Sequence, residues 1–115
     1  MIKNTEQMQK EIRENMRGGG GSVEILHWFQ PGEYNGKARL LAKITLREGC
    51  GIGTHTHDGE EEIFYIIKGT GVYDDNGVVK AVTAGDVTIT KDGASHSIKN
   101  ESTEDLLFVA VILTY

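Results

Sequence analysis

Residues 49–69 read GCGIGTHTHDGEEEIFYIIKG, and the spacing of the polar residues within this stretch decides the fold. His55 and His57 are two residues apart, so both side chains lie on one face of a β-strand, whereas neighbours on a helix face are three or four residues apart. A polar turn follows at residues 58–61, and Glu62 then opens a run of β-branched and aromatic residues that closes at Gly69. The stretch therefore predicts two facing strands, with Glu62 opposite the histidine pair.

Two motifs carry a resemblance to a known family. The stretch that begins at Gly49 resembles the first motif of the cupin superfamily, which has a glycine, five residues, His-x-His, four residues, a glutamate, six residues and a glycine. Residues 85–100 are similar to the second cupin motif, with Gly93, then His96 three residues later, and Asn100 four residues after that. The proline expected two residues before Gly93 is Lys91 here, which affects turn rigidity but not the histidine.

The resemblance extends over residues 23–114 and implies a small single-domain cupin. It implies that a metal ion is held by His55, His57, Glu62 and His96. The alternative is a cupin barrel that keeps these residues and works without metal. Glu60 and Glu61 do not fit the motif spacing, and we expect both to be solvated. No residue is assigned to catalysis or to an organic cofactor.

Length and composition indicate one compact domain. A chain of 115 residues can bury one core, and its fifteen glycines with a single proline favour a fold with many tight turns. No stretch is apolar enough to span a bilayer, and the N-terminus lacks the apolar run of a signal peptide, so we expect a cytoplasmic protein without a membrane partner. A net charge of −5 and scattered basic residues argue against a nucleic-acid partner.

The N-terminal segment differs in pattern from the rest of the chain. Residues 5–16 are predicted to form a short α-helix, capped by Asn4 with Gln7 at the capping-box position. Its apolar stripe of Met8, Ile12 and Met16 is narrow, enough for docking but not for a core. The predicted organisation is a helical segment at 1–17, a flexible glycine-rich linker at 18–22 and a barrel domain at 23–115.

From residue 23 onward the pattern is that of β-strands. Ala38 to Leu46 alternates with period two, and Asn76-Gly77 suits a type I′ turn between two strands. The predicted strands are 23–29, 38–46, 71–74, 78–82, 87–90, 95–100 and 106–114, together with those around the histidines. Many short strands without alternating helices predict an all-β fold, and the cupin resemblance implies the double-stranded β-helix, or jelly-roll, barrel.

The strand after the histidines is apolar on both faces. Phe64 and Ile66 share the face of Glu62, whereas Ile63, Tyr65 and Ile67 occupy the other. Because one thin barrel covers only one of these faces, we expect a homodimer; the alternative is that the N-terminal helix of the same chain covers the second face.

Ligands of this kind suit a six-coordinate divalent ion of manganese, iron, nickel or zinc with two positions open for a small molecule. The first functional expectation is a small metal-dependent enzyme acting on an oxygen-rich metabolite, with dioxygenase, isomerase or epimerase, and decarboxylase or lyase chemistry all implied by the resemblance. The second is a non-catalytic small-molecule binding or sensory module. A protein with a purely structural metal is the third.

Six further residues have open roles. His27 is either an acid or base near the metal or an ordinary core histidine. Four others could orient an anionic or hydroxylated substrate, and each is also an ordinary strand or turn residue: Tyr34, Arg39, Tyr65 and Tyr73. The lone cysteine, Cys50, is expected to serve packing rather than thiol chemistry.

Overall fold

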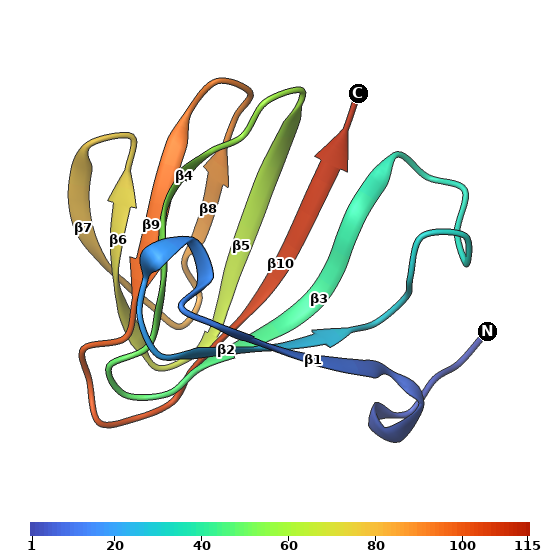
Figure 1. The fold of residues 1–115 in the computed structure, drawn as a ribbon, viewed down its shortest axis with the longest axis horizontal. Helices are drawn as coiled ribbons and strands as arrows, with labels where there is room; N and C mark the ends of the chain where they lie inside the picture. Colours follow the sequence, from blue (N-terminus) through green and yellow to red (C-terminus); the bar gives the residue numbers. More distant parts are fainter.

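The structure, a computed structural model, describes all 115 residues and consists of two antiparallel sheets (Figure 1). The six-stranded sheet contains, in spatial order, β1 (Gln9–Glu14), β2 (Ser22–His27), β3 (Ala38–Leu46), β10 (Leu106–Thr114), β5 (Glu60–Lys68) and β8 (Val87–Thr90). The four-stranded sheet contains β4 (Gly51–Thr56), β9 (Ser95–Lys99), β6 (Thr70–Asp75) and β7 (Val78–Thr83). Two 3-10 turns, η1 (Thr5–Gln7) and η2 (Met16–Gly18), are the only helical elements.

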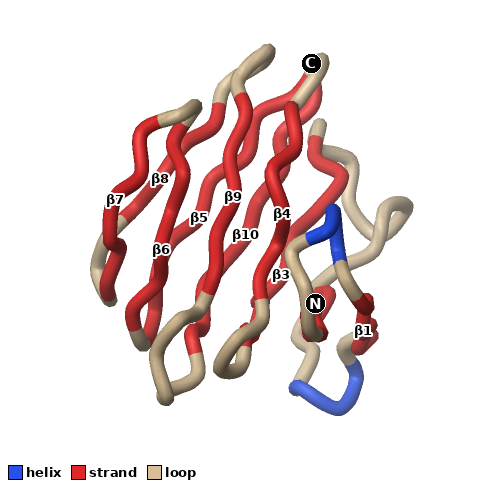
Figure 2. Tube along the Cα trace, turned by 60° about the vertical axis from the view of Figure 1, so that its left-hand side comes forward, coloured by secondary structure: helices blue, strands red, loops and turns tan.

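The two sheets pack face to face around one core (Figure 2). Its largest fully buried side chains include Phe64 and Phe108 from the six-stranded sheet and Ile98 from the four-stranded sheet. The predicted all-β jelly-roll architecture is confirmed, but the sheets remain separate and do not close into a barrel. No helix is long and apolar enough to cross a membrane.

Strand patterns predicted most of these elements. The period-two stretch forms β3, in which Ala42, Ile44 and Leu46 are buried. Asn76 and Gly77 both have positive φ, 50° and 98°, and join β6 to β7 in a two-residue hairpin, as a type I′ turn requires. Gly93 also has positive φ, so the turn after β8 forms with Lys91 in place of proline.

The predicted N-terminal α-helix is wrong. Asn4 and Gln7 do form a capping box, but it caps only the 3-10 turn η1. Residues 9–14 instead form β1, which pairs antiparallel with β2 along its whole length. Pairing with the exposed edge of β2 satisfies the backbone groups that an isolated short helix would satisfy only marginally in water.

The glycine-rich run expected to be a linker lies in the loop that joins β1 to β2 and at the start of β2. Figure 1 shows the turn η2 of this loop beside β4. The approach is close, because a Cβ on Gly19 would overlap backbone atoms of Gly51 and Gly53. We refer to residues 15–21 as the hairpin loop.

Candidate metal centre

Three elements place the four residues of the cupin motifs at one end of the sandwich. His55 lies in β4 directly opposite His96 in β9, and His57 follows β4 immediately. Glu62 comes from β5 in the other sheet. His57, Glu62 and His96 are almost completely buried, so water reaches little of the cluster. These four predicted residues are brought together in space.

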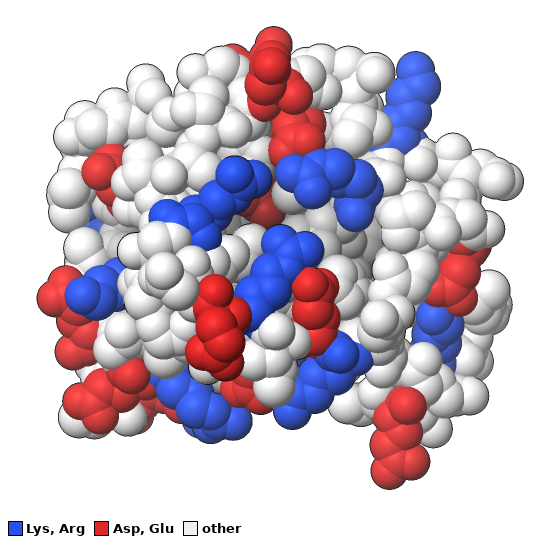
Figure 3. All heavy atoms as spheres, in the orientation of Figure 1, with Lys and Arg blue, Asp and Glu red and all other residues white.

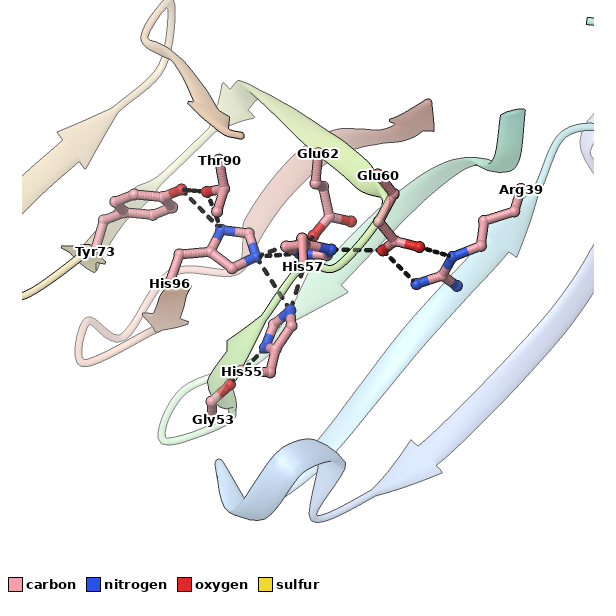
Figure 4. A network of polar contacts seen from close by, with 9 residues as sticks. All are labelled: Arg39, Gly53, His55, His57, Glu60, Glu62, Tyr73, Thr90 and His96. Atoms are coloured by element: carbon pink, nitrogen blue, oxygen red, sulfur yellow. Dashed lines mark hydrogen bonds and ion pairs between the residues drawn. The ribbon is translucent and has the colours of Figure 1, made fainter. Parts of the chain in front are cut away.

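Their donor atoms converge on one point (Figure 4). The four donor atoms all lie within 4.8 Å of one another. Glu62 Oε1 is 3.0 Å from the Nε2 atoms of both His57 and His96, and 3.9 Å from that of His55. The Nε2 atoms of His96 and His55 are 3.1 Å apart. One ion could therefore contact all four side chains.

Hydrogen bonds on the opposite ring nitrogens set the direction of two imidazoles. His55 Nδ1 lies 2.8 Å from the carbonyl oxygen of Gly53, which can only accept, so Nδ1 carries the proton and Nε2 presents a lone pair. His57 Nδ1 donates in the same way to Glu60 Oε2 at 2.6 Å. Outer partners of this kind fix the tautomer and orientation of metal-binding histidines.

His96 is held by hydroxyl groups. Its Nδ1 lies 2.8 Å from the hydroxyl oxygens of both Tyr73 and Thr90, in a fully buried network (Figure 4). The ring also stacks on Phe64, with centroids 5.0 Å apart. Tyr73 was named from the sequence as a substrate-orienting candidate, and it lies behind a histidine instead.

The electrostatics of the cluster favour a bound cation. Burial is the largest influence on the pKa of Glu62 and acts to raise it, but the three histidines together hold that pKa well below its ordinary value. The carboxylate of Glu62 accepts a hydrogen bond from the protonated form of His57 and so raises the pKa of His57, whereas burial lowers the pKa of His96. The ionised carboxylate of Glu62 and the Nε2 lone pairs of His55 and His57 thus face a common point. A divalent metal ion bound there would be coordinated by all three groups.

The expectation that Glu60 is solvated is wrong. It is not a solvated turn residue: its side chain is 13% exposed and lies between His57 and Arg39. Arg39 donates two hydrogen bonds to it, at 2.6 and 2.7 Å, and these chiefly lower the pKa of Glu60 to about 2. Glu60 therefore stays ionised at neutral pH and serves to orient His57.

A cavity with a volume of about 70 Å³ opens onto His55, His57 and Glu62. Its apolar wall comes from both sheets and the hairpin loop: Met16, Ile25, Leu40, Ile44, Ile52 and Ile112. Its polar wall consists of Arg13, Arg17, His27 and Arg39. This volume is far below that of pockets for drug-sized molecules, so the cavity suits a small ligand.

The structure distributes the remaining candidates around this cavity. His27 lines it and bonds through Nε2 to Glu11 at 2.8 Å, while Arg39 lines it as expected. Tyr34 donates to the Ala38 carbonyl and Tyr65 is exposed, neither of them at the cavity. Cys50 packs against the core, outside the cluster.

Sequence reasoning missed two cavity residues, Arg13 and Arg17. Both lie in the segment predicted to be a separate helix, and only the pairing of β1 with β2 brings them to the cavity. No pattern within residues 9–17 predicts that this segment pairs with β2.

A two-sheet jelly roll with three histidines and a glutamate converging at one end defines a class of small β-proteins. The family described as Cupin domain matches residues 42–112, and the chain belongs to this family.

Similar proteins agree with this assignment. The chain is 44% identical over 113 residues to a Thermotoga maritima protein named oxalate-binding protein, covering 98% of this chain and 93% of that one. A crystal structure described as a predicted oxalate decarboxylase from Thermotoga maritima matches with a TM-score of 0.94 and 43% identity, with both chains covered completely. A crystal structure described as a sugar phosphate isomerase from Silicibacter pomeroyi matches with a TM-score of 0.79 and 16% identity. The match covers 97% of this chain and 74% of the isomerase chain, and it supports the fold alone.

Proposed function

We propose that this protein holds one divalent metal ion through His55, His57, Glu62 and His96 and uses it to bind a small carboxylate, with oxalate as the first candidate. The observation that carries the proposal is that three residues of the cluster and three arginines line the same small cavity. The names of the Thermotoga maritima relatives point to the same ligand.

The cavity chemistry supports an anionic ligand. Figure 3 shows several Lys and Arg side chains around a hollow near the centre of the face it draws, with Asp and Glu side chains among them, on a chain whose net charge is −5. A manganese, iron, nickel or zinc ion would act as a Lewis acid toward carboxylate oxygens. The positive charge of the arginines attracts an anion to the cavity, and the apolar wall excludes water from one side of it.

Turnover is the second candidate function, and one observation favours it. Decarboxylation of oxalate releases one carbon as CO₂ and requires a proton for the other. His27 is the only acid–base residue lining the cavity besides the metal ligands, and its contact with Glu11 orients its ring. Isomerase or epimerase chemistry usually needs an acid and a base on the substrate, and the cavity offers one such group beyond the ligands.

The test combines metal analysis, binding and product detection. We expect the metal-loaded protein to bind oxalate in calorimetry, and His96→Ala to lose both metal and oxalate while keeping its β-type circular dichroism spectrum. An unchanged metal content in His96→Ala would remove that histidine from the ligand set. Formate and CO₂ released by wild type but not by His27→Asn would identify an enzyme, whereas tight binding without either product would identify a binding protein.

We also propose that two copies associate through the outer face of the six-stranded sheet. Two rows of side chains cross four strands of this face: Leu41, Val111, Ile63 and Ile89 in one, and Lys43, Val109, Tyr65 and Val87 in the other. Seven of these eight are apolar or aromatic, and Val87 is 66% exposed. Monomers rarely expose a contiguous apolar face of this kind.

A further inference from the structure

The three arginines around the metal cavity differ in what they contact. Arg13 Nε lies 2.7 Å from Glu11, and Arg39 makes its two hydrogen bonds to Glu60. Arg17 has no carboxylate partner in the protein, although it lines the same cavity. Arg17 is exposed to solvent, and its guanidinium is always charged and presents a planar set of donors that matches a carboxylate. It is therefore the one cavity arginine whose donors are not already used by a carboxylate of the protein.

The backbone of Arg17 is unusual for a residue with a side chain. Its φ and ψ are 54° and 25°, in the left-handed region. Other positive-φ positions of the hairpin loop are occupied by residues that adopt this conformation easily, namely Asn15, Gly18, Gly20 and Gly21. An arginine at such a position is disfavoured for the backbone alone, and strained residues of this kind cluster at ligand sites.

The hairpin loop is fixed to the strand that carries the metal ligands. A Cβ on Gly53 would overlap the carbonyl oxygen of Arg17, so only glycine allows the two backbones to approach this closely. The carbonyl oxygen of the same Gly53 accepts the hydrogen bond from His55 Nδ1. Figure 4 shows η2 below Gly53 and His55. Gly53 thus contacts the loop and also orients His55, which fixes the backbone of Arg17 relative to the cluster.

We propose that Arg17 determines the specificity of the cavity for dicarboxylates. Its guanidinium pairs with the ligand carboxylate oxygens that do not contact the metal, so a two-carbon dicarboxylate is preferred over a monocarboxylate of similar size. The assignment rests on the proposed function, because it requires a metal-bound carboxylate in the same cavity. Beyond that function, it identifies Arg17 as the residue that distinguishes a dicarboxylate from a monocarboxylate.

The test compares oxalate with glycolate, which has a single carboxylate, in calorimetric titrations of the metal-loaded protein. Replacing Arg17 by Gln should weaken oxalate binding about ten- to hundredfold, the loss expected for a charge-assisted hydrogen bond, and should change glycolate binding much less. Arg17→Lys should recover part of the affinity but not the full preference, because an ammonium group is not bidentate. Metal content should stay at the wild-type value in both variants.

Arg47→Gln is the matched control. Arg47 pairs with Glu24 and Asp105 outside the cavity, so the same loss of charge there should leave both titrations unchanged. Wild-type oxalate affinity in Arg17→Gln, or an equal loss in Arg47→Gln, would overturn the role of Arg17 and leave the proposed function standing. Metal-loaded wild type that binds neither acid would overturn the proposed function and the specificity assignment together.

Discussion

The three imidazoles of the cluster differ in the group that holds their Nδ1 atom. His55 is held by a backbone carbonyl, His57 by an ionised carboxylate and His96 by two hydroxyl groups. A carboxylate partner makes an imidazole a more electron-rich ligand than a neutral partner does, so His57 should bind the metal most strongly. Arg39 in turn keeps Glu60 ionised, which links a cavity arginine to the candidate metal site through one side chain.

The ionised state of Glu60 should make the stability of the protein depend on pH. The pKa of Glu60 is lowered from 4.5 to about 2, chiefly by the hydrogen bonds from Arg39, so its ionised form stabilises the fold above pH 4.5 and this stabilisation is lost as the pH falls toward 2. We expect Glu60→Gln to lower the unfolding free energy of the metal-free protein near pH 6 and to flatten its decline between pH 4.5 and 2. Urea unfolding across this range measures both.

Glu101→Gln is the control, because Glu101 is exposed and has no ion pair. Its unfolding curves should follow those of wild type. If Glu60→Gln retains the wild-type pH dependence, the contacts of Glu60 with Arg39 and His57 contribute nothing to stability.

Among the strands, sequence patterns predicted β4, β5 and β9, which carry the four residues of the cluster. They did not predict β1. His55, His57, Glu62 and His96 were found because motif spacing and strand alternation are local properties. The cap and an apolar residue every four positions predict a helix at 5–16. A spacing of four also keeps side chains on one face of a strand, so periodicity could not separate the two, and pairing with β2 decided the outcome.

The cavity was only partly predictable for the same reason. Arg39 is a candidate from the sequence because its charge could orient an anionic substrate, and it lines the cavity. Arg17 reaches the cavity through a left-handed backbone and a contact with Gly53, and neither feature is visible in a sequence. The composition of residues 18–22 is typical of a flexible linker, but Gly19 and Gly21 lie too close to β4 and Cys50 to carry a Cβ, and composition does not reveal such contacts.

The close contact of Gly19 with β4 should make the protein sensitive to a larger residue at this position. The φ of Gly19, −76°, suits any residue, so Gly19→Ala adds no backbone strain, and its only cost is the overlap of the new methyl group with Gly51 and Gly53. We expect a loss of about 1–3 kcal/mol in unfolding free energy, as for other overpacked sites, and faster hydrogen exchange in residues 15–21. Thermal melting and exchange mass spectrometry measure these effects.

Gly36→Ala is the matched control for that substitution. A Cβ at Gly36 meets no atom within 4 Å and its φ lies outside the left-handed region, so the same change there should leave the protein as stable or slightly more stable. Equal behaviour of the two variants would show that the hairpin loop is not held by its contact with β4.

For the whole molecule, the exposed face of the six-stranded sheet predicts self-association. We expect a solution mass of twice 12.6 kDa for wild type and a shift toward the monomer when Tyr65, which is 48% exposed on this face, is replaced by Lys. Val79→Lys is the control, since Val79 is 62% exposed but lies on β7 of the other sheet. Light scattering that gives a monomer for wild type, or a dimer for Tyr65→Lys, would exclude this face as the interface.

Metal binding, protonation and global stability are also coupled. An ion that binds only the folded protein raises the unfolding free energy by RT ln(1 + [M]/Kd), about 2.7 kcal/mol at a hundredfold excess over Kd. For a domain near this size the melting temperature should rise by several degrees or more, about 4 to 8 °C per kcal/mol for slightly smaller domains. This gain should appear at neutral pH with whichever of manganese, iron, nickel or zinc the cluster prefers.

Acid should remove this gain, because imidazole coordinates only as the neutral base and protons compete for it near pH ~6.5. His57 should be protonated first as the pH falls, since its hydrogen bond to the Glu62 carboxylate raises its pKa, whereas burial lowers the pKa of His96 and delays its protonation. We therefore expect the metal-induced rise in melting temperature at pH 7.5 to be lost at pH 5, while the metal-free protein changes little. Melting curves with and without each metal, in wild type and His96→Ala, measure this. A metal-induced rise that persists at pH 5, or in the absence of His96, would mean that the ion binds somewhere other than these four residues.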